Sequence, residues 1–273
     1  MTFQQRDTVD KLKPGEWRGI SFQSAEPQTP FAPEWRFTIG EKDISNRVDV
    51  VAFRDYLLEK EQELISKYPA GSDGSTKLGP NSVTSRFEHF NLMTFDHPCV
   101  HALKAQIKKF HRQYCKSVVS LTYRDPGRMR IRSWFNVMRK GQRIQKHLHS
   151  MHAHTYLGGH FTVACDNSST IYVNPYDHAN TPDIERRIFK QGEGYDTQSF
   201  YNGVNVPGKL TLFPNYLPHF TTKHMSDTER ITIAFDITPI PQMFQSDKTD
   251  LPLLNKAREP IEDAEWRDSH DIL

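Results

Sequence analysis

The chain has 273 residues, of which 36% are hydrophobic, and this length and composition predict a soluble chain that can bury a sizeable core. Its formal net charge is +2 and its basic and acidic residues are mixed along the sequence, so the composition gives no reason to expect nucleic acid or a membrane surface as a partner. The three cysteines, Cys99, Cys115 and Cys165, have no CxxC spacing and suit free thiols in a reducing compartment, so we expect a cytoplasmic protein.

The first half of the chain is expected to contain two helices. Residues 1–30 are polar, carry no apolar signal sequence, and predict an N-terminal arm. Apolar residues recur at helical spacing over residues 50–68, where Pro69 ends the pattern. A second helix is expected after Asp96, which we predict as its N-cap. Between the two helices, residues 86–93 are predicted to form a strand.

From residue 118 onward the apolar pattern changes from a helical period to alternation, which is typical of strands. Two helices followed by many short strands predict a mostly β fold, with the helices packed on one sheet of a sandwich or barrel. We expect a single domain over residues 31–240, with an insertion at 175–205 and a peripheral C-terminal tail at 241–273. The predicted strands are residues 35–39, 130–138, 144–149, 155–164, 170–173, 209–213, 220–223 and 230–237.

A histidine-rich segment, residues 141–160, is the first candidate for a functional site. It holds five of the thirteen histidines: His147, His149, His152, His154 and His160. Alternate side chains of a strand share a face, so His147 and His149 point the same way. A second block, residues 207–237, adds His219, and we predict that the two blocks together form one metal site. Neutral imidazoles suit Fe(II), Zn, Ni or Cu, and because Cys165 is the only nearby thiol, a structural cysteine-type zinc site is disfavoured.

The third ligand of this site is open. His147 and His219 are the firmest predicted ligands, and His149 is the predicted third because it shares the face of His147. His152 and His154 are rivals, since the loop after His149 could turn either of them inward. No carboxylate stands two residues after His147, where a site of two histidines and one carboxylate would have it. The alternative interpretation is a histidine-rich surface hairpin that binds nothing.

Residues 230–237 alternate strictly between apolar and other side chains. The odd positions are Ile or Phe, so Arg230, Thr232 and Ala234 face the other way. Inside a barrel, an arginine with a hydroxyl two residues later is suited to hold a carboxylate by two hydrogen bonds. The alternative is a surface ion pair, which requires Arg230 to point at solvent.

Both blocks resemble the 2-oxoglutarate-Fe(II) oxygenases of the double-stranded β-helix class, also called jelly-roll or cupin-like. The motifs are a tryptophan-containing strand, a Lys-Gly turn, His-x-His, a Gly-Gly strand, Pro-Gly, Phe-Pro with a following histidine, and an Arg-x-Thr strand. They stand here at residues 134–138, 140–141, 147–149, 157–159, 207–208, 213–219 and 230–232, and the likeness covers roughly residues 35 to 238.

The layout of residues 136–147 is also similar to that of the aspartyl/asparaginyl β-hydroxylases, which likewise lack the acidic ligand. That likeness implies that His147 binds iron and that His149 stands where the carboxylate would normally be. It also implies that Asn136 and His160 contact the co-substrate, and that Arg230 binds its carboxylate.

Together the resemblances imply a 2-oxoglutarate-dependent non-haem iron dioxygenase, most often a hydroxylase, which uses Fe(II), 2-oxoglutarate and O2 and releases succinate and CO2. The catalytic residues would be His147, His219 and Arg230, and Arg230, Thr232, Asn136 and His160 would bind the co-substrate. We expect a small polar substrate, such as an amino-acid-like compound or a natural-product precursor, and the sequence leaves a homodimer open. Residues 175–205 are the expected lid, in which Arg186, Arg187, Tyr195 and Tyr201 would meet the substrate.

Two other functions fit parts of the pattern. A cupin-type dioxygenase or isomerase that uses several histidines and no 2-oxoglutarate fits the Gly-x5-His-x-His spacing equally well. The pair Arg230 and Thr232 favours the oxygenase, because a cupin has no fixed need for a carboxylate-binding arginine. A barrel that binds a metal or small ligand without catalysis is the third function.

Overall fold

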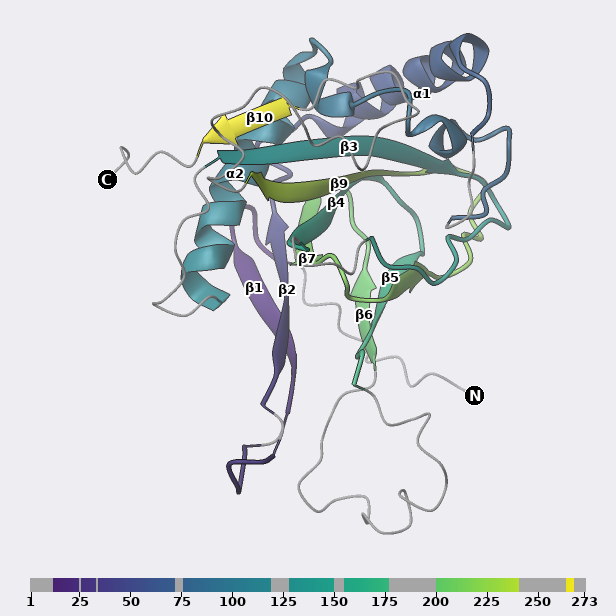
Figure 1. The fold of residues 1–273 in the computed structure, drawn as a ribbon. Helices are drawn as coiled ribbons and strands as arrows, with labels where there is room; N and C mark the ends of the chain where they lie inside the picture. Colours follow the sequence, from purple (N-terminus) through teal and green to yellow (C-terminus); the bar gives the residue numbers. More distant parts are fainter. Residues whose placement is uncertain are drawn as a thin grey trace.

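The computed structural model describes residues 12–24, 26–32, 34–71, 76–118, 128–149, 155–176, 200–240 and 264–267. In these ranges the chain forms two antiparallel sheets and two α-helices (Figure 1). None of the helices described is long and apolar enough to cross a membrane.

The helices are α1 (Val50–Lys67) and α2 (Pro98–Val118), and two short 3-10 helices, η1 (Val83–Arg86) and η2 (Leu92–Thr94), lie between them in the sequence. The strands are β1 (Trp17–Gln23), β2 (Arg36–Asp43), β3 (Arg128–Met138), β4 (Leu157–Ala164), β5 (Ser169–Val173), β6 (Phe200–Val204), β7 (Lys209–Pro214), β8 (His219–Thr221), β9 (Arg230–Ile240) and β10 (Ala264–Arg267).

The two sheets face each other as a jelly roll. The large sheet has the strand order β1-β2-β7-β4-β9-β3-β10, and the small sheet has the order β6-β5-β8. The segment before residue 149 runs beside β8, because His147 and His219 exchange backbone hydrogen bonds of 3.0 and 2.9 Å. From β3 to β9 the chain therefore passes back and forth between the sheets, which is the predicted double-stranded β-helix.

Both helices pack on the outer face of the large sheet, as predicted (Figure 1). The side chain of Asp49 caps α1 by accepting the N–H groups of Val51 and Ala52. Apolar side chains of both helices form one buried cluster with the outward-facing residues of the large sheet. The fully buried members include Phe53, Leu57, Leu103, Phe110, Phe161, Ile233 and Phe235.

The prediction of a strand at residues 86–93 is wrong, because this segment lies in η1, η2 and the turns between them. The side chain of Ser82 accepts the N–H of Ser85, and that of Asn91 accepts the N–H of Met93, which turns the backbone at both places.

The predicted cap of α2 is also wrong. The helix begins at Pro98, so His97 is at the N-cap, and its Nδ1 accepts the N–H of Cys99 at 3.3 Å. The carboxylate of Asp96 instead lies 2.9 Å from the ring of His101.

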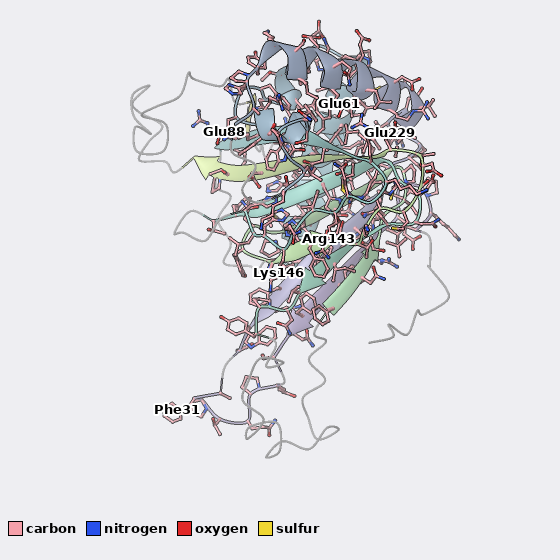
Figure 2. All side chains as sticks on the ribbon, turned by 90° about the vertical axis from the view of Figure 1, so that its right-hand side faces the viewer. Phe31, Glu61, Glu88, Arg143, Lys146 and Glu229 are labelled. Atoms are coloured by element: carbon pink, nitrogen blue, oxygen red, sulfur yellow. The ribbon has the colours of Figure 1, made fainter. Side chains whose placement is uncertain are left out.

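The large sheet extends beyond the predicted domain limits of 31 and 240. Residues 17–23, which were expected in an N-terminal arm, form β1 and pair with β2 along their whole length. Residues 264–267 form β10, which pairs with β3. The loop between β1 and β2 carries Phe31, which is 95% exposed and lies far from the helices (Figure 2). The division of the chain into domains stays a prediction.

Candidate metal and co-substrate site

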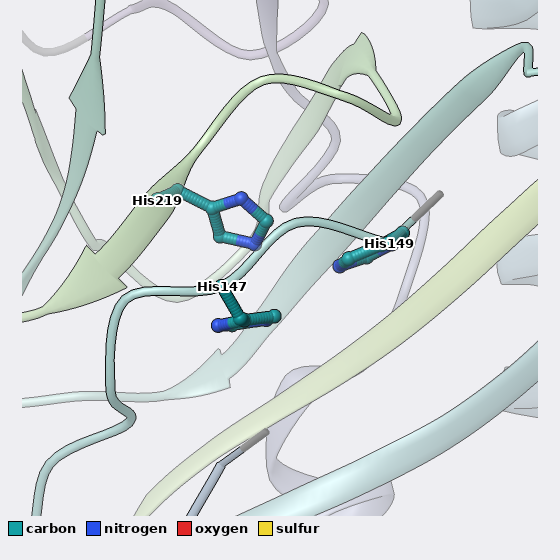
Figure 3. A group of neighbouring side chains, drawn as sticks. All are labelled: His147, His149 and His219. Atoms are coloured by element: carbon teal, nitrogen blue, oxygen red, sulfur yellow. The ribbon is translucent and has the colours of Figure 1, made fainter. Parts of the chain in front are cut away.

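Three histidines from two chain segments converge inside the barrel (Figure 3). His147 and His149 lie on the segment beside β8, and His219 begins β8 itself. The ring centroid of His219 lies 4.4 Å from that of His147 and 5.1 Å from that of His149. One ring nitrogen of each histidine lies within 4.8 Å of the other two. Three donors at this spacing can bind a single metal ion.

Each of the three rings uses Nδ1 for a hydrogen bond to an oxygen. The acceptors are the carbonyl oxygens of Gln145 and Leu217, at 2.8 and 2.9 Å, and Oδ1 of Asp236, at 2.5 Å. Because a carbonyl or a carboxylate oxygen accepts the bond, Nδ1 carries the proton and Nε2 keeps a free lone pair. This is the arrangement that orients histidine ligands around a metal.

Burial favours the neutral form of two of the three rings, those of His147 and His219. Burial, and then the neighbouring His149, lower the pKa of His147 to about 4. Burial, and then His147 and His149, hold the pKa of His219 well below its ordinary value. Metals bind the neutral imidazole, so these two side chains need not lose a proton to bind one.

A cavity of about 280 Å³ lies beside the three histidines. Asn136, His160, Arg230 and Thr232 line this cavity, as do all three histidines. The structure therefore brings together each predicted metal ligand and each predicted co-substrate-binding residue that it describes. His152 and His154, the rival ligands, lie outside the described residues.

Arg230 is the first residue of β9, and Asp236 lies further along the same strand. Arg230 is buried, with 2% of its surface exposed. Its Nη1 lies 3.2 Å from Sδ of Met138 and 3.4 Å from Oγ1 of Thr232. The side-chain oxygen of Asn205, with the amide turned to face the guanidinium, accepts from Nη2 at 3.0 Å. Nε of Arg230 has no partner, and no carboxylate of the described residues pairs with this arginine. The surface ion pair that was the alternative is excluded.

A second buried cation near His160 shows the contrast. Lys209 is also buried, but it donates to Oε1 of Glu41 at 2.7 Å. Glu41 also binds Arg18 and the hydroxyl of Tyr201, so Tyr201 belongs to this ion cluster and does not line the cavity. An unpaired buried charge is costly, so the guanidinium of Arg230 is suited to an incoming anion. A carboxylate would match its two-pronged geometry.

The other two residues predicted to contact the co-substrate, Asn136 and His160, place polar groups at the cavity. Oδ1 of Asn136 accepts from the hydroxyl of Thr84 at 2.8 Å. Nε2 of His160 lies 2.7 Å from the hydroxyl of Tyr172, while Nδ1 of His160 is buried without a partner. Burial holds the pKa of His160 well below its usual range, so its ring is neutral.

Two site residues, Asp236 and Asn205, were not predicted from the sequence. Asp236 continues the inward-facing series that begins with Arg230 and Thr232, so the alternation of β9 already held the signal. Asn205 follows β6, where the polar sequence gives no register. Residues 144–149 were predicted as a strand, and they form only an isolated bridge to β8. Arg186, Arg187 and Tyr195, expected in the lid, lie outside the described residues.

Comparison with known proteins supplies one family match. A family model described as "Putative 2OG-Fe(II) oxygenase" matches residues 132–236. No curated protein sequence matches the chain significantly.

Several solved structures are distantly similar. A prolyl-4-hydroxylase from Pseudomonas putida has a TM-score of 0.43 and 9% identity, over 74% of this chain and 92% of that one. AviO1 from Streptomyces viridochromogenes has a TM-score of 0.45 and 12% identity, over 74% of this chain and 90% of that one. HygX from Streptomyces hygroscopicus, crystallised with nickel and 2-oxoglutarate, has a TM-score of 0.35 and 16% identity, over 70% of this chain and 76% of that one. Such distant likenesses do not define what this protein does.

Both cofactors in the family's description have a matching feature in the cavity. The three imidazoles with free Nε2 atoms fit Fe(II), and the buried guanidinium without a carboxylate partner fits 2-oxoglutarate. The matched segment contains all three histidines and Arg230. This match confirms the resemblance drawn from the sequence: residues 132–236 match the family model described as a putative 2OG-Fe(II) oxygenase.

Proposed function

We propose that the protein is an Fe(II)- and 2-oxoglutarate-dependent dioxygenase that hydroxylates a small polar molecule. One observation carries the proposal: a single cavity holds three imidazoles with free Nε2 atoms and a buried arginine without a carboxylate partner among the described residues. The proposed metal ligands are His147, His149 and His219.

When bound, iron with 2-oxoglutarate and O2 supplies the oxidation of the substrate and releases succinate and CO2. The three histidines would hold the metal through their Nε2 atoms. Arg230 holds the far carboxylate of 2-oxoglutarate by two charge-assisted hydrogen bonds, and Thr232 adds its hydroxyl. Asn136 and His160 offer polar atoms along the cavity wall.

The size of the cavity favours a small substrate. Its volume of about 280 Å³ lies just below the roughly 300–1,000 Å³ usual for ligand pockets, and 2-oxoglutarate would share it. A small molecule, or one end of a larger one, fits the space that is left.

The test is succinate formation by the purified protein. We expect succinate to form only when Fe(II) and 2-oxoglutarate are both present, and Arg230→Ala to abolish most of it. Arg54→Ala is the matched control, because Arg54 is exposed on α1 and pairs with Asp55. A protein that binds iron and gains no affinity for 2-oxoglutarate would be a cupin-type enzyme, and one that binds neither would contradict the proposal.

A screen of small polar compounds then addresses the substrate. We expect one class of these compounds to raise the rate of succinate formation and to gain the mass of one oxygen atom. Stimulation only by polymers such as peptides or nucleic acids would contradict the small-molecule part of the proposal.

A further inference from the structure

Asp236 lies on the inner face of β9, at the metal end of the cavity. The strand register places it between Gly158 of β4 and Arg132 of β3. Arg132 does not pair with it, since the guanidinium donates to the carbonyl oxygen of Phe87 and lies over the Phe87 ring. Among the described residues, the ion-pair partner of Asp236 is therefore His149 alone, at 2.5 Å.

The ring of His149 fits beside Asp236 because residue 158 is a glycine. A Cβ on Gly158 would lie 3.0 Å from Nδ1 of His149 and 2.5 Å from Oδ1 of Asn215. The backbone N–H of His149 donates to the carbonyl oxygen of Asn215 at 2.9 Å, which fixes the chain on the other side. A missing side chain, a backbone hydrogen bond and a carboxylate thus act together on one imidazole.

The charge of the proposed metal site explains why this carboxylate matters. Three neutral imidazoles bring no negative charge to a divalent ion, whereas two histidines and a carboxylate bring one. Asp236 lies one hydrogen bond away from the donor set, and a carboxylate in that position orients the ring and makes Nε2 a stronger donor.

We propose that Asp236 is a positioning residue for His149. Through the ring of His149 it supplies the metal site with the negative charge that a carboxylate ligand two residues after His147 would otherwise bring. The role rests on the proposed function only in requiring that the three histidines form a metal site. It identifies His149 as the third ligand without reference to His152 or His154.

The experiment is titration of the metal-free full-length protein with Co(II), in the absence of 2-oxoglutarate. Asp236→Asn keeps an oxygen acceptor of nearly the same shape and removes the charge, and Asp236→Ala removes the acceptor as well. Asp227→Asn is the matched control, because Asp227 is an exposed carboxylate paired with Lys140. Circular dichroism of the metal-free variants checks their folding.

We expect Asp236→Ala to weaken Co(II) binding by roughly 10–100-fold, Asp236→Asn to weaken it less, and Asp227→Asn to leave it unchanged. Both Asp236 variants should also shift the visible absorption bands of bound Co(II), which a purely structural role would not do. If Asp236→Ala does not fold, Asp236→Asn decides the question by the same two measurements.

Wild-type affinity and an unshifted Co(II) spectrum in Asp236→Asn and in any folded Asp236→Ala would overturn the positioning role. So would a His149→Ala variant that binds Co(II) normally while Asp236→Asn does not, because Asp236 would then be a ligand itself. A wild-type protein without affinity for Co(II) would instead contradict the metal site, and the proposed function with it.

Discussion

The two faces of β9 are both shielded from water and have opposite chemistry. On the outer face Ile231, Ile233, Phe235 and Ile237 are each 0% exposed and pack in the core beneath the helices. On the inner face Arg230 and Thr232 are 2% and 3% exposed and line the cavity. Burial of the outer face contributes stability, whereas burial of polar groups on the inner face costs free energy that a ligand can recover. The direction of the side chains thus decides which residues of β9 pack in the core and which line the cavity.

Two adjacent glycines of β4 repeat this division. A Cβ on Gly158 would point toward the histidine side of the sheet, so the glycine leaves room for the ring of His149. Gly159 faces the helices, and a Cβ there would lie 2.4 Å from Cζ of Phe235. Each glycine therefore admits one ring, on opposite faces of the same sheet. If the two faces act independently, changes on one face should leave the property of the other intact.

The largest expected effect comes from the inner face. His219→Ala should abolish metal binding, because the two histidines that remain lie on one segment and the opposing donor is lost. Co(II) titration measures this, with His101→Ala as the control, since His101 is exposed on α2. Retained affinity in His219→Ala would show that the cluster is not the metal site.

On the outer face, Phe235→Ala should lower the free energy of unfolding by about 3–5 kcal/mol, because the ring is fully buried and leaves a cavity. Urea denaturation measures the loss, and Phe31→Ala serves as the control on an exposed ring. The folded variant should still bind Co(II). A matching loss of metal affinity would mean that the two faces are not independent.

Arg230→Ala should leave Co(II) affinity unchanged and weaken 2-oxoglutarate binding by about 2–4 kcal/mol, because a desolvated two-pronged ion pair is lost. Calorimetry with the metal-loaded protein measures both affinities. Arg230→Lys keeps the charge but lacks the planar guanidinium, so its affinity for 2-oxoglutarate should lie between those of the wild type and Arg230→Ala. Unchanged 2-oxoglutarate affinity in Arg230→Ala would remove this arginine from the co-substrate site.

The sequence was most informative where alternation fixed a face. The direction of Arg230 and Thr232 followed from the apolar odd positions of residues 230–237, and the structure confirms it. The convergence of His147 and His219 followed from the motif pairing.

Other features depended on contacts that sequence periodicity does not report. The turns at η1 and η2 are set by the side chains of Ser82 and Asn91, which replaced the expected strand. β1 joins the sheet through pairing with β2, although it lies in a segment that was expected to be an N-terminal arm. The role of Asp236 depends on the register between β4 and β9, which no local pattern contains.

The inner face should also make the metal-free protein sensitive to acid. In the folded state the pKa of His147 is about 4, whereas the pKa of an unfolded histidine is near 6.5. Between these values the unfolded state binds more protons, so the free energy of unfolding falls as the pH falls, by roughly 3 kcal/mol for His147 alone. Urea denaturation at several pH values between 7 and 4 measures the slope, which should be shallower in His147→Gln. An equal slope in both proteins would assign the effect to other groups.

The smallest expected effects give the sharpest comparison, because they come from neighbouring residues of one strand. Thr232→Val replaces a hydroxyl 3.4 Å from Nη1 of Arg230 with a methyl group of similar size. It should weaken 2-oxoglutarate binding by about 1 kcal/mol and change stability little. Ile233→Val removes one buried methyl group on the other face, and should lower the free energy of unfolding by about 0.5–1.5 kcal/mol without affecting 2-oxoglutarate. The same calorimetry and urea denaturation are applied to both variants. If either variant changed 2-oxoglutarate affinity and the free energy of unfolding by similar amounts, the two faces of β9 would not act independently. The effect of the substitution would then have to pass through the strand backbone.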